Sequence, residues 1–218
     1  MGWNYYWTTG GGAQQPKYNQ FQYHGCDVGC GPTAWAMLFC WADYQAAHGN
    51  AYWAPRNGLY RQNGGRGAEA VAPLMQDKGV NNAIRELHNE VHTFCAFGSG
   101  ATCPWDMPDA TAYLSGRSGT TLQANWDSFG ICEDRLRDAA ITSIVNRHTP
   151  AVIGTGWLSH YPMAFGYATQ QRTVRRCFIW CWDDVVTDRC FYVNEGWGGG
   201  GAGDWIEAST WFVGQIFP

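Results

Sequence analysis

The sequence predicts an α+β fold in which helices fill the first part of the chain and strands fill the last part. A helical period is present up to about residue 146, and short runs rich in β-branched and aromatic residues replace it from residue 151 onward. The chain has 218 residues, 45% hydrophobic and 15% charged, which is enough apolar material for one core. Helices followed by strands allow a helical half and a sheet half to face each other across a cleft.

The first helix is expected to begin at Cys30. Residues 1–25 are rich in Gly, Gln, Asn and Tyr and have no helical period, so they predict an extended lead-in. Pro32 suits the first turn of a helix, where its missing N–H costs nothing. The run from Thr33 to Ala42 is apolar on nearly every side. It therefore predicts a buried helix with Cys30 at its N-terminus.

Other helices and strands are predicted from the same periodicities. Helices are expected as one or two segments within 65–92, with Ala70, Leu74, Ile84, Leu87 and Val91 as apolar positions, then at 109–114 and at 133–146. Strands are expected at 151–154, 163–167, 178–182, 191–193 and within 205–212. The basic cluster 172–176 predicts a solvated hairpin edge.

Nine cysteines are many for this length, and their density predicts an oxidising compartment in which disulfides persist. The odd number leaves at least one thiol without an intramolecular partner. A zinc site is the alternative, but Cys177 and Cys181 are separated by three residues and the chain has no C-x-x-C pair. We therefore expect neither metal nor cofactor. Cys30 is expected to be the free thiol and the other eight cysteines to form four bridges, with a local pair among Cys177, Cys181 and Cys190.

The charge and hydropathy of the chain exclude some classes of partner. The net charge is −4 and there is no run of Lys and Arg, which argues against a nucleic-acid partner. No apolar stretch approaches the roughly 20 residues that span a bilayer, and the first residues lack the positive start and apolar run of a signal peptide. We expect a secreted monomer without a membrane partner, any signal or pro-segment having been removed.

Cys30 is the candidate nucleophile. A thiolate is a better nucleophile than a thiol, and the N–H groups and dipole at a helix N-terminus lower the pKa of a thiol placed there. Cys40 lies inside the same predicted helix and Cys26 lies before it. The alternative for Cys30 is one end of a disulfide.

A catalytic thiol needs a base, and the base needs a group that holds its tautomer. Of six histidines, His160 precedes an apolar strand and follows a Gly-containing loop, which places it at the rim of the sheet. A lone histidine at a strand start is usually structural, so this interpretation depends on Cys30. Asn194 ends a strand; its amide oxygen could accept the His160 N–H, and Trp197 could shield that bond from water.

Three motifs occur in the order found in papain-like cysteine peptidases. They are GCGPTAWAM at 29–37, HYPMAFGY at 160–167 and VNEGWGG at 193–199. The chain most resembles the streptopain-type and bacteriocin-leader-peptidase-like bacterial branches, over about residues 16–40 and 150–212. His160 lies 130 residues after Cys30, within the roughly 130–150 residues typical of the family. Asn194 lies 164 residues after Cys30, and a hairpin carrying Cys177, Cys181 and Cys190 accounts for the delay.

The resemblance implies a papain-like fold in one domain covering 1–218. A helical lobe at about 26–148 would pack against an antiparallel, β-barrel-like lobe formed by about 150–218 and the N-terminal lead-in. It also implies a secreted cysteine endopeptidase that hydrolyses a protein or peptide substrate. Cys30, His160 and Asn194 would form the triad, and a thioester acyl-enzyme would be the intermediate.

The oxyanion donor departs from the family pattern. The family commonly places a Gln six residues before the nucleophile, and that position is His24 here. We expect Gln20 to be the donor, with Gln22 as the alternative, and a loop inserted around Cys26 to absorb the additional residues.

Two other functions are alternatives to a peptidase. A cell-wall peptide amidase or transpeptidase would use the same triad. A non-enzymatic secreted binding module would suit the 13 Trp and 28 Gly residues, with Cys30 merely bridged.

Overall fold

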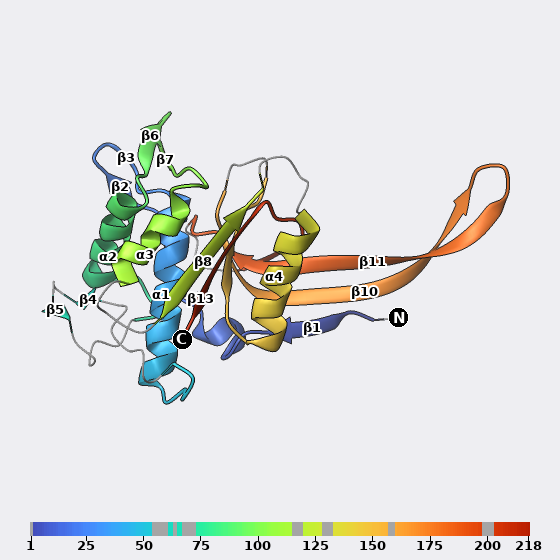
Figure 1. Ribbon diagram of the computed structural model, residues 1–218, viewed down its shortest axis with the longest axis horizontal. Coiled ribbons are helices and arrows are strands. Elements are labelled where there is room, and N and C mark those ends of the chain that lie inside the picture. Colours follow the sequence, from blue (N-terminus) through green and yellow to red (C-terminus); the bar gives the residue numbers. More distant parts are fainter. Residues whose placement is uncertain are drawn as a thin grey trace.

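The computed structural model describes residues 2–53, 61–62, 65–66, 73–114, 120–127, 133–156, 160–197 and 203–218. It combines helices with an antiparallel sheet, which confirms the α+β class (Figure 1). The helices are α1 Cys30–Ala47, α2 Lys78–Glu90, α3 Thr111–Leu114, α4 Glu133–Asn146 and the 3-10 helices η1 Gly11–Gln14 and η3 Met107–Ala110. The strands are β1 Asn4–Trp7, β2 Gln22–Tyr23, β3 Cys26–Asp27, β4 Arg61–Gln62, β5 Gly65–Arg66, β6 Phe94–Ala96, β7 Ser99–Ala101, β8 Thr121–Trp126, β9 Ala151–Ile153, β10 Met163–Cys177, β11 Cys181–Asn194, β12 Asp204–Glu207 and β13 Phe212–Phe217.

Helix α1 is the buried centre of the molecule, as the sequence predicts. Every residue from Gly31 to Asp43 is buried, and the side chains of Trp35 and Trp41 are among the largest that are fully enclosed. One side of the helix packs against α2, and the other side meets the sheet, where a Cβ at Gly214 would lie 2.5 Å from the Trp35 ring. Helix α1 is therefore held between α2 and the sheet.

The main sheet runs in the order β12-β11-β10-β9-β13-β8, with β1 added beside β10. Residues alternate between its two faces. Val152 and Met163 belong to the core cluster around α1, whereas Ile153 and Ala164 belong to the cluster formed with α4. Helices α1 and α4 therefore cover opposite faces. Helix α4 packs on the sheet rather than on the other helices, although it lies within 26–148, the range predicted for the helical lobe.

The long hairpin β10–β11 corrects one predicted strand. The segment 178–182 was expected to be a strand, but residues 178–180 form the turn, and Cys177 pairs with Cys181 across it. The predicted strands 163–167 and 191–193 are the inner ends of β10 and β11, and the basic cluster 172–176 lies on the hairpin as expected. Figure 1 shows the hairpin projecting away from the body of the molecule.

The helical prediction within 65–92 is correct only for its second half. Helix α2 begins after Asp77, whose side chain accepts a hydrogen bond from the Val80 N–H at 2.8 Å as an N-cap. Leu74 precedes this cap, Gly65–Arg66 is a strand, and Ala70 lies outside the described residues. The segment 205–212 divides into the end of β12 and the start of β13.

Two disulfides are present, Cys26–Cys95 and Cys177–Cys181. The second confirms the predicted local pair and removes both of its cysteines as zinc ligands. The prediction of four bridges is wrong, because Cys103 and Cys190 are not bridged in the described part of the chain; Cys132 lies outside it. Of the helices described, none has the length and hydrophobicity to cross a membrane.

Candidate functional site

Cys30 is the first residue of α1 and forms no disulfide in the described structure. Burial raises the pKa of its thiol, and the backbone N–H groups of Tyr161, Cys30 and Gly31, which hydrogen-bond to the sulfur, offset this only in part. The sequence predicts the opposite, a thiol pKa lowered by the helix N-terminus. The structure thus places Cys30 at the helix N-terminus as expected, but burial there favours the neutral thiol.

The glycines beside Cys30 let its backbone approach β7 and the segment after it. Gly29 has φ +99, a conformation that L side chains rarely adopt, and a Cβ there would lie 3.2 Å from the Gly100 carbonyl oxygen. A Cβ at Gly31 would lie 2.9 Å from the Met107 sulfur. Because both neighbours of Cys30 are glycines, the start of α1 can lie close to Gly100 and to Met107.

His160 lies just before β10, and its carbonyl accepts a hydrogen bond from the Thr155 N–H at 2.9 Å. The next residue is Tyr161, whose N–H contacts the Cys30 sulfur. The fold therefore brings His160 and Cys30, which are 130 positions apart, to one place. The imidazole is 9% exposed. Burial lowers the pKa of His160 to about 4, an effect that the nearby Glu195 carbonyl only partly offsets.

The indole of Trp197 contacts the imidazole directly. Its Nε1–H donates a hydrogen bond of 2.8 Å to Nε2 of His160, whereas the buried Nδ1 has no hydrogen-bond partner among the described residues. An indole nitrogen can only donate, so Nε2 must be unprotonated, and a neutral ring then carries its proton on Nδ1. A base must offer a free lone pair to the thiol. In this arrangement Nδ1 carries a proton and Nε2 accepts the indole hydrogen bond, so neither nitrogen of the ring has a free lone pair.

Asn194 ends β11 opposite Met163, close to His160. Its Nδ2 donates to the Pro16 carbonyl at 2.9 Å, and its Oδ1 accepts from the Gly196 N–H at 3.0 Å. None of its hydrogen bonds in the described structure goes to His160; Trp197 binds the imidazole instead. Asn194 thus anchors the turn that carries Trp197, and its role as the orienting residue stays a prediction.

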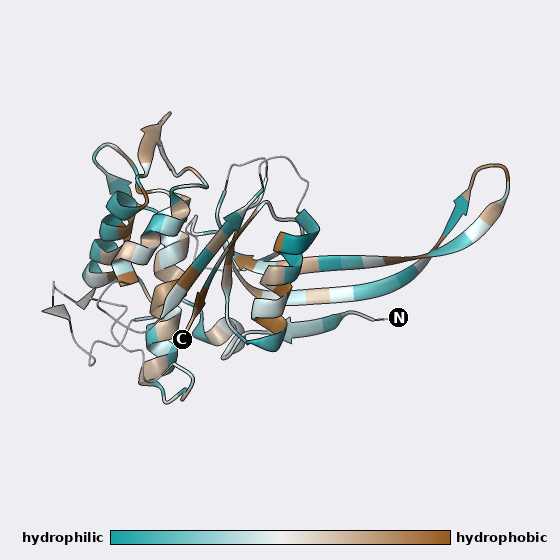
Figure 2. Cartoon of the chain, in the orientation of Figure 1, coloured by the Kyte–Doolittle hydropathy of each residue, from teal (hydrophilic) through white to brown (hydrophobic). Residues whose placement is uncertain are grey.

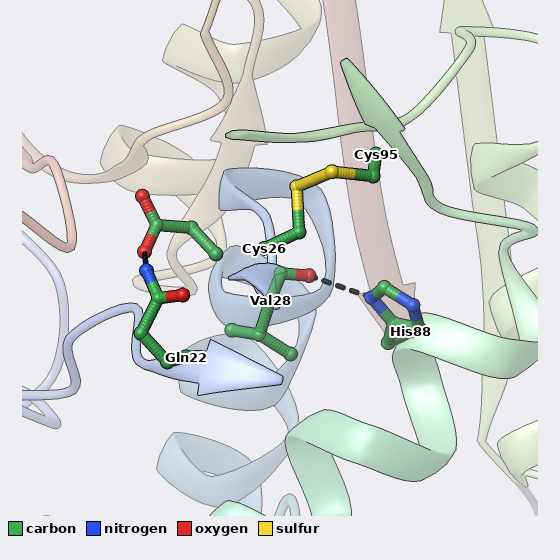
Figure 3. The surroundings of a disulfide bond; sticks show 6 residues. Gln22, Cys26, Val28, His88 and Cys95 are labelled. Carbon is green, nitrogen blue, oxygen red and sulfur yellow. Dashed lines mark hydrogen bonds between the residues drawn. A yellow bond between two sulfur atoms is a disulfide. The ribbon is translucent and has the colours of Figure 1, made fainter. Parts of the chain in front are cut away.

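The segment before Cys30 distinguishes the two candidate oxyanion donors. The Val28 N–H donates to the Phe21 carbonyl at 2.9 Å, which closes the short hairpin β2–β3 as an insertion. Gln22 lies on this exposed hairpin and its amide donates to Asp27 at 2.5 Å (Figure 3). The Gln20 N–H instead donates to the Gly196 carbonyl at 3.0 Å, beside the turn of Trp197. This placement favours Gln20 over Gln22.

The inserted hairpin is tied to its surroundings, as Figure 3 shows. Cys26 is bonded to Cys95 of β6, and Nδ1 of His88 in α2 lies 2.8 Å from the Val28 carbonyl. His24, at the position where the family commonly has its Gln, is an exposed residue in the hairpin turn with φ 52. A short hairpin is therefore present around Cys26, where the sequence predicts an inserted loop, and His24 is exposed at its turn.

Sequence reasoning missed two groups of this site. One is the N–H of Tyr161, whose hydroxyl also donates to the Thr102 carbonyl at 3.2 Å. The other is Trp197, which was expected to shield a hydrogen bond and instead makes one. The signal for Trp197 was its position three residues after Asn194. Nothing in the residue pattern indicated that a main-chain N–H would meet the thiol.

No family model matches the chain, and no curated protein matches it with significance. Among solved structures, a fragment of Prevotella intermedia prointerpain A is similar, with a TM-score of 0.49 and 12% identity over 92% of this chain and 69% of that one. A likeness at this identity and TM-score carries neither a family nor an activity to the chain.

Proposed function

We propose that the chain is a secreted papain-like cysteine endopeptidase with Cys30 as nucleophile and His160 as base. The observation that supports this proposal is an unbridged thiol at the first residue of α1, close to the backbone of Tyr161, the residue that follows the buried His160. Two disulfides are consistent with an oxidising compartment. Cys30 is unbridged, whereas a binding module was expected to have it bridged.

The reaction begins with both groups neutral. His160 takes the thiol proton as the sulfur attacks the peptide carbonyl, and the protonated ring then passes that proton to the leaving amine. A thioester between Cys30 and the acyl group results. Water, deprotonated by His160, then attacks this thioester and releases the acid and the free thiol. In each acylation and deacylation step, the Cys30 N–H and the Gln20 amide would stabilise the oxyanion.

Transfer of the thiol proton to His160 requires that the indole of Trp197 first leaves Nε2 of the imidazole. The indole caps Nε2, so the ring cannot adopt the tautomer in which Nδ1 is free. Trp197 is 67% exposed, so its departure from the imidazole loses little packing. Once the indole has left, the Nδ1 lone pair becomes available to the thiol. Asn194 would then be the residue that accepts the Nε2–H.

The test is hydrolysis of a peptide library by the purified chain and its variants. Cys30→Ala should lower activity by at least ~10³-fold, on the scale of losses when a catalytic nucleophile is removed. Cys190→Ser is the matched control, because Cys190 is also an unbridged, partly buried thiol, and it should retain activity. His160→Ala should be nearly as damaging as Cys30→Ala, and His148→Ala should be mild. A Cys30→Ala protein that retains most of its activity would disprove the proposal.

A further inference from the structure

The outer part of the β10–β11 hairpin is a two-stranded ribbon. β1 pairs with β10 only as far as Thr169, and β12 pairs with β11 only from Cys190. Between them the two strands pair with each other alone, in continuous register to Cys177 and Cys181. An isolated two-stranded hairpin is marginally stable in water, and here the disulfide closes its end. The ribbon therefore presents a constrained loop far from the body (Figure 1).

The loop at the end of this ribbon is apolar and exposed. Phe178, Ile179 and Trp180 are 89%, 78% and 70% exposed, and Trp182 beside them is 45% exposed. Figure 2 shows hydrophobic colour at the end of the hairpin, beyond the largely hydrophilic outer strands. Contiguous apolar side chains at one exposed place mark an interaction site in soluble proteins. We call these four residues the hairpin tip.

The charges next to the hairpin tip cancel. Arg176 pairs with Asp184 at 2.8 Å and Arg172 pairs with Asp188 at 2.7 Å. Arg175 lies opposite Asp183 in the strand register. Three arginines thus face three aspartates, so residues 170–177 and 181–188 behind the tip carry no net charge, and Arg189 adds one positive charge at the base of the ribbon, opposite Thr169. An anionic partner at the tip would gain no attraction from the neutral segments.

The shape and size of the tip favour a lipid surface over a folded protein. At 150–250 Å² for each large side chain, four partly exposed ones offer on the order of 500 Å², and a specific protein interface needs about 800 Å² from each partner. A bilayer surface accepts a convex apolar loop, and Trp prefers the region between headgroups and acyl chains. We propose that the hairpin tip inserts into the interfacial region of a lipid bilayer.

This proposal revises the expectation of no membrane partner. That expectation rested on the length needed to span a bilayer, whereas an interfacial contact needs only a few apolar residues on one side of the membrane. The disulfide between Cys177 and Cys181 holds the loop closed before contact, which reduces the conformational entropy lost on binding. The neutral ribbon implies that binding depends little on anionic lipid.

Flotation of the full chain with phosphatidylcholine vesicles tests the proposal. The triple variant Phe178→Ser, Ile179→Ser, Trp180→Ser should reduce the bound fraction at least fivefold, and both cysteines stay in place. Phe97→Asn is the matched control, because Phe97 is a fully exposed aromatic residue on the β6–β7 turn with φ 52, which Asn tolerates. It should float like the wild type. Adding phosphatidylglycerol or raising the salt concentration should change wild-type binding less than twofold.

Three results would overturn the proposal. One is a wild-type chain that does not float, and another is a triple variant that floats as well as the wild type. The third is binding that requires anionic lipid, because the neutral ribbon provides no reason for it. Size-exclusion chromatography tests whether the hairpin tip instead binds a second copy of the chain. A wild-type protein that is dimeric and does not float, together with a triple variant that is monomeric, would show this.

Discussion

Lowering the pH should destabilise the protein through His160. Burial lowers the pKa of this imidazole from 6.5 to about 4 in the folded chain. Between pH 6.5 and pH 4 the unfolded chain holds a proton on His160 that the folded chain does not. The contribution of His160 to the free energy of unfolding is therefore complete above pH 6.5 and is lost as the pH falls to about 4. Since one pKa unit corresponds to about 1.4 kcal/mol, the free energy of unfolding should fall by about 3 kcal/mol from this residue alone.

Urea unfolding at pH 7.0, 5.5 and 4.0 measures this loss in the wild type and in His160→Gln. Glutamine does not titrate, and every other ionisable group is common to both proteins. The difference between their two pH dependences therefore isolates His160, whatever the variant's stability at pH 7.0. His24→Asn is the matched control, because His24 is exposed and its φ of 52 suits Asn. It should keep the wild-type pH dependence.

The reasoning is refuted if His160→Gln loses stability with pH as steeply as the wild type does. The folded chain would then take up the proton near the ordinary pKa of histidine. A neutral imidazole would no longer describe the resting site, and a charged pair with the Cys30 thiolate would become the better description.

The remaining predictions concern the groups around the imidazole. Trp197→Phe removes the N–H that caps Nε2, so the His160 pKa followed by NMR should rise, and an unchanged pKa would contradict the role given to the indole. Gln20→Ala should lower turnover by about 10²–10³-fold, as loss of an oxyanion donor does, whereas Gln22→Ala should change it little; the reverse order would make Gln22 the donor. Asn194→Ala should reduce turnover without abolishing it. It should also lower the free energy of unfolding by about 1–3 kcal/mol, because two buried backbone groups lose their hydrogen-bond partner. An unchanged stability in urea would argue against the anchoring role.

Much of the fold was predictable because its core elements carry strong local patterns. Helix α1 is apolar on all sides, and it is buried as that pattern requires. Strand β8 was missed because its residues are largely polar and exposed, and its conformation is set by pairing with β13. The segment 178–182 was misread because aromatic residues favour strands, whereas residues 178–180 form the hairpin turn between the disulfide-bonded Cys177 and Cys181.

The members of the candidate site were proposed from motif and spacing, and their contacts could not be. The fold brings the backbone of Tyr161, which follows His160, close to Cys30. The partners of Asn194 are the Pro16 carbonyl and the Gly196 N–H. These are main-chain groups, which every residue possesses, so no residue type signals them. The predicted direction of the Cys30 pKa shift was wrong because burial outweighs the effect of the helix N-terminus. The burial of a side chain is known only once the fold is known.

The protonation states of Cys30 and His160 determine how the thiol should react. Burial raises the pKa of the Cys30 thiol and lowers the pKa of His160 to about 4. Both shifts favour the neutral thiol and imidazole over the thiolate–imidazolium pair. Cys30 should therefore react slowly with iodoacetamide at pH 7. Because Trp197 contributes to keeping the ring neutral, Trp197→Phe should accelerate this alkylation. The exposed indole would then regulate the nucleophile through the base, and equal alkylation rates in the two proteins would leave burial as the sole cause.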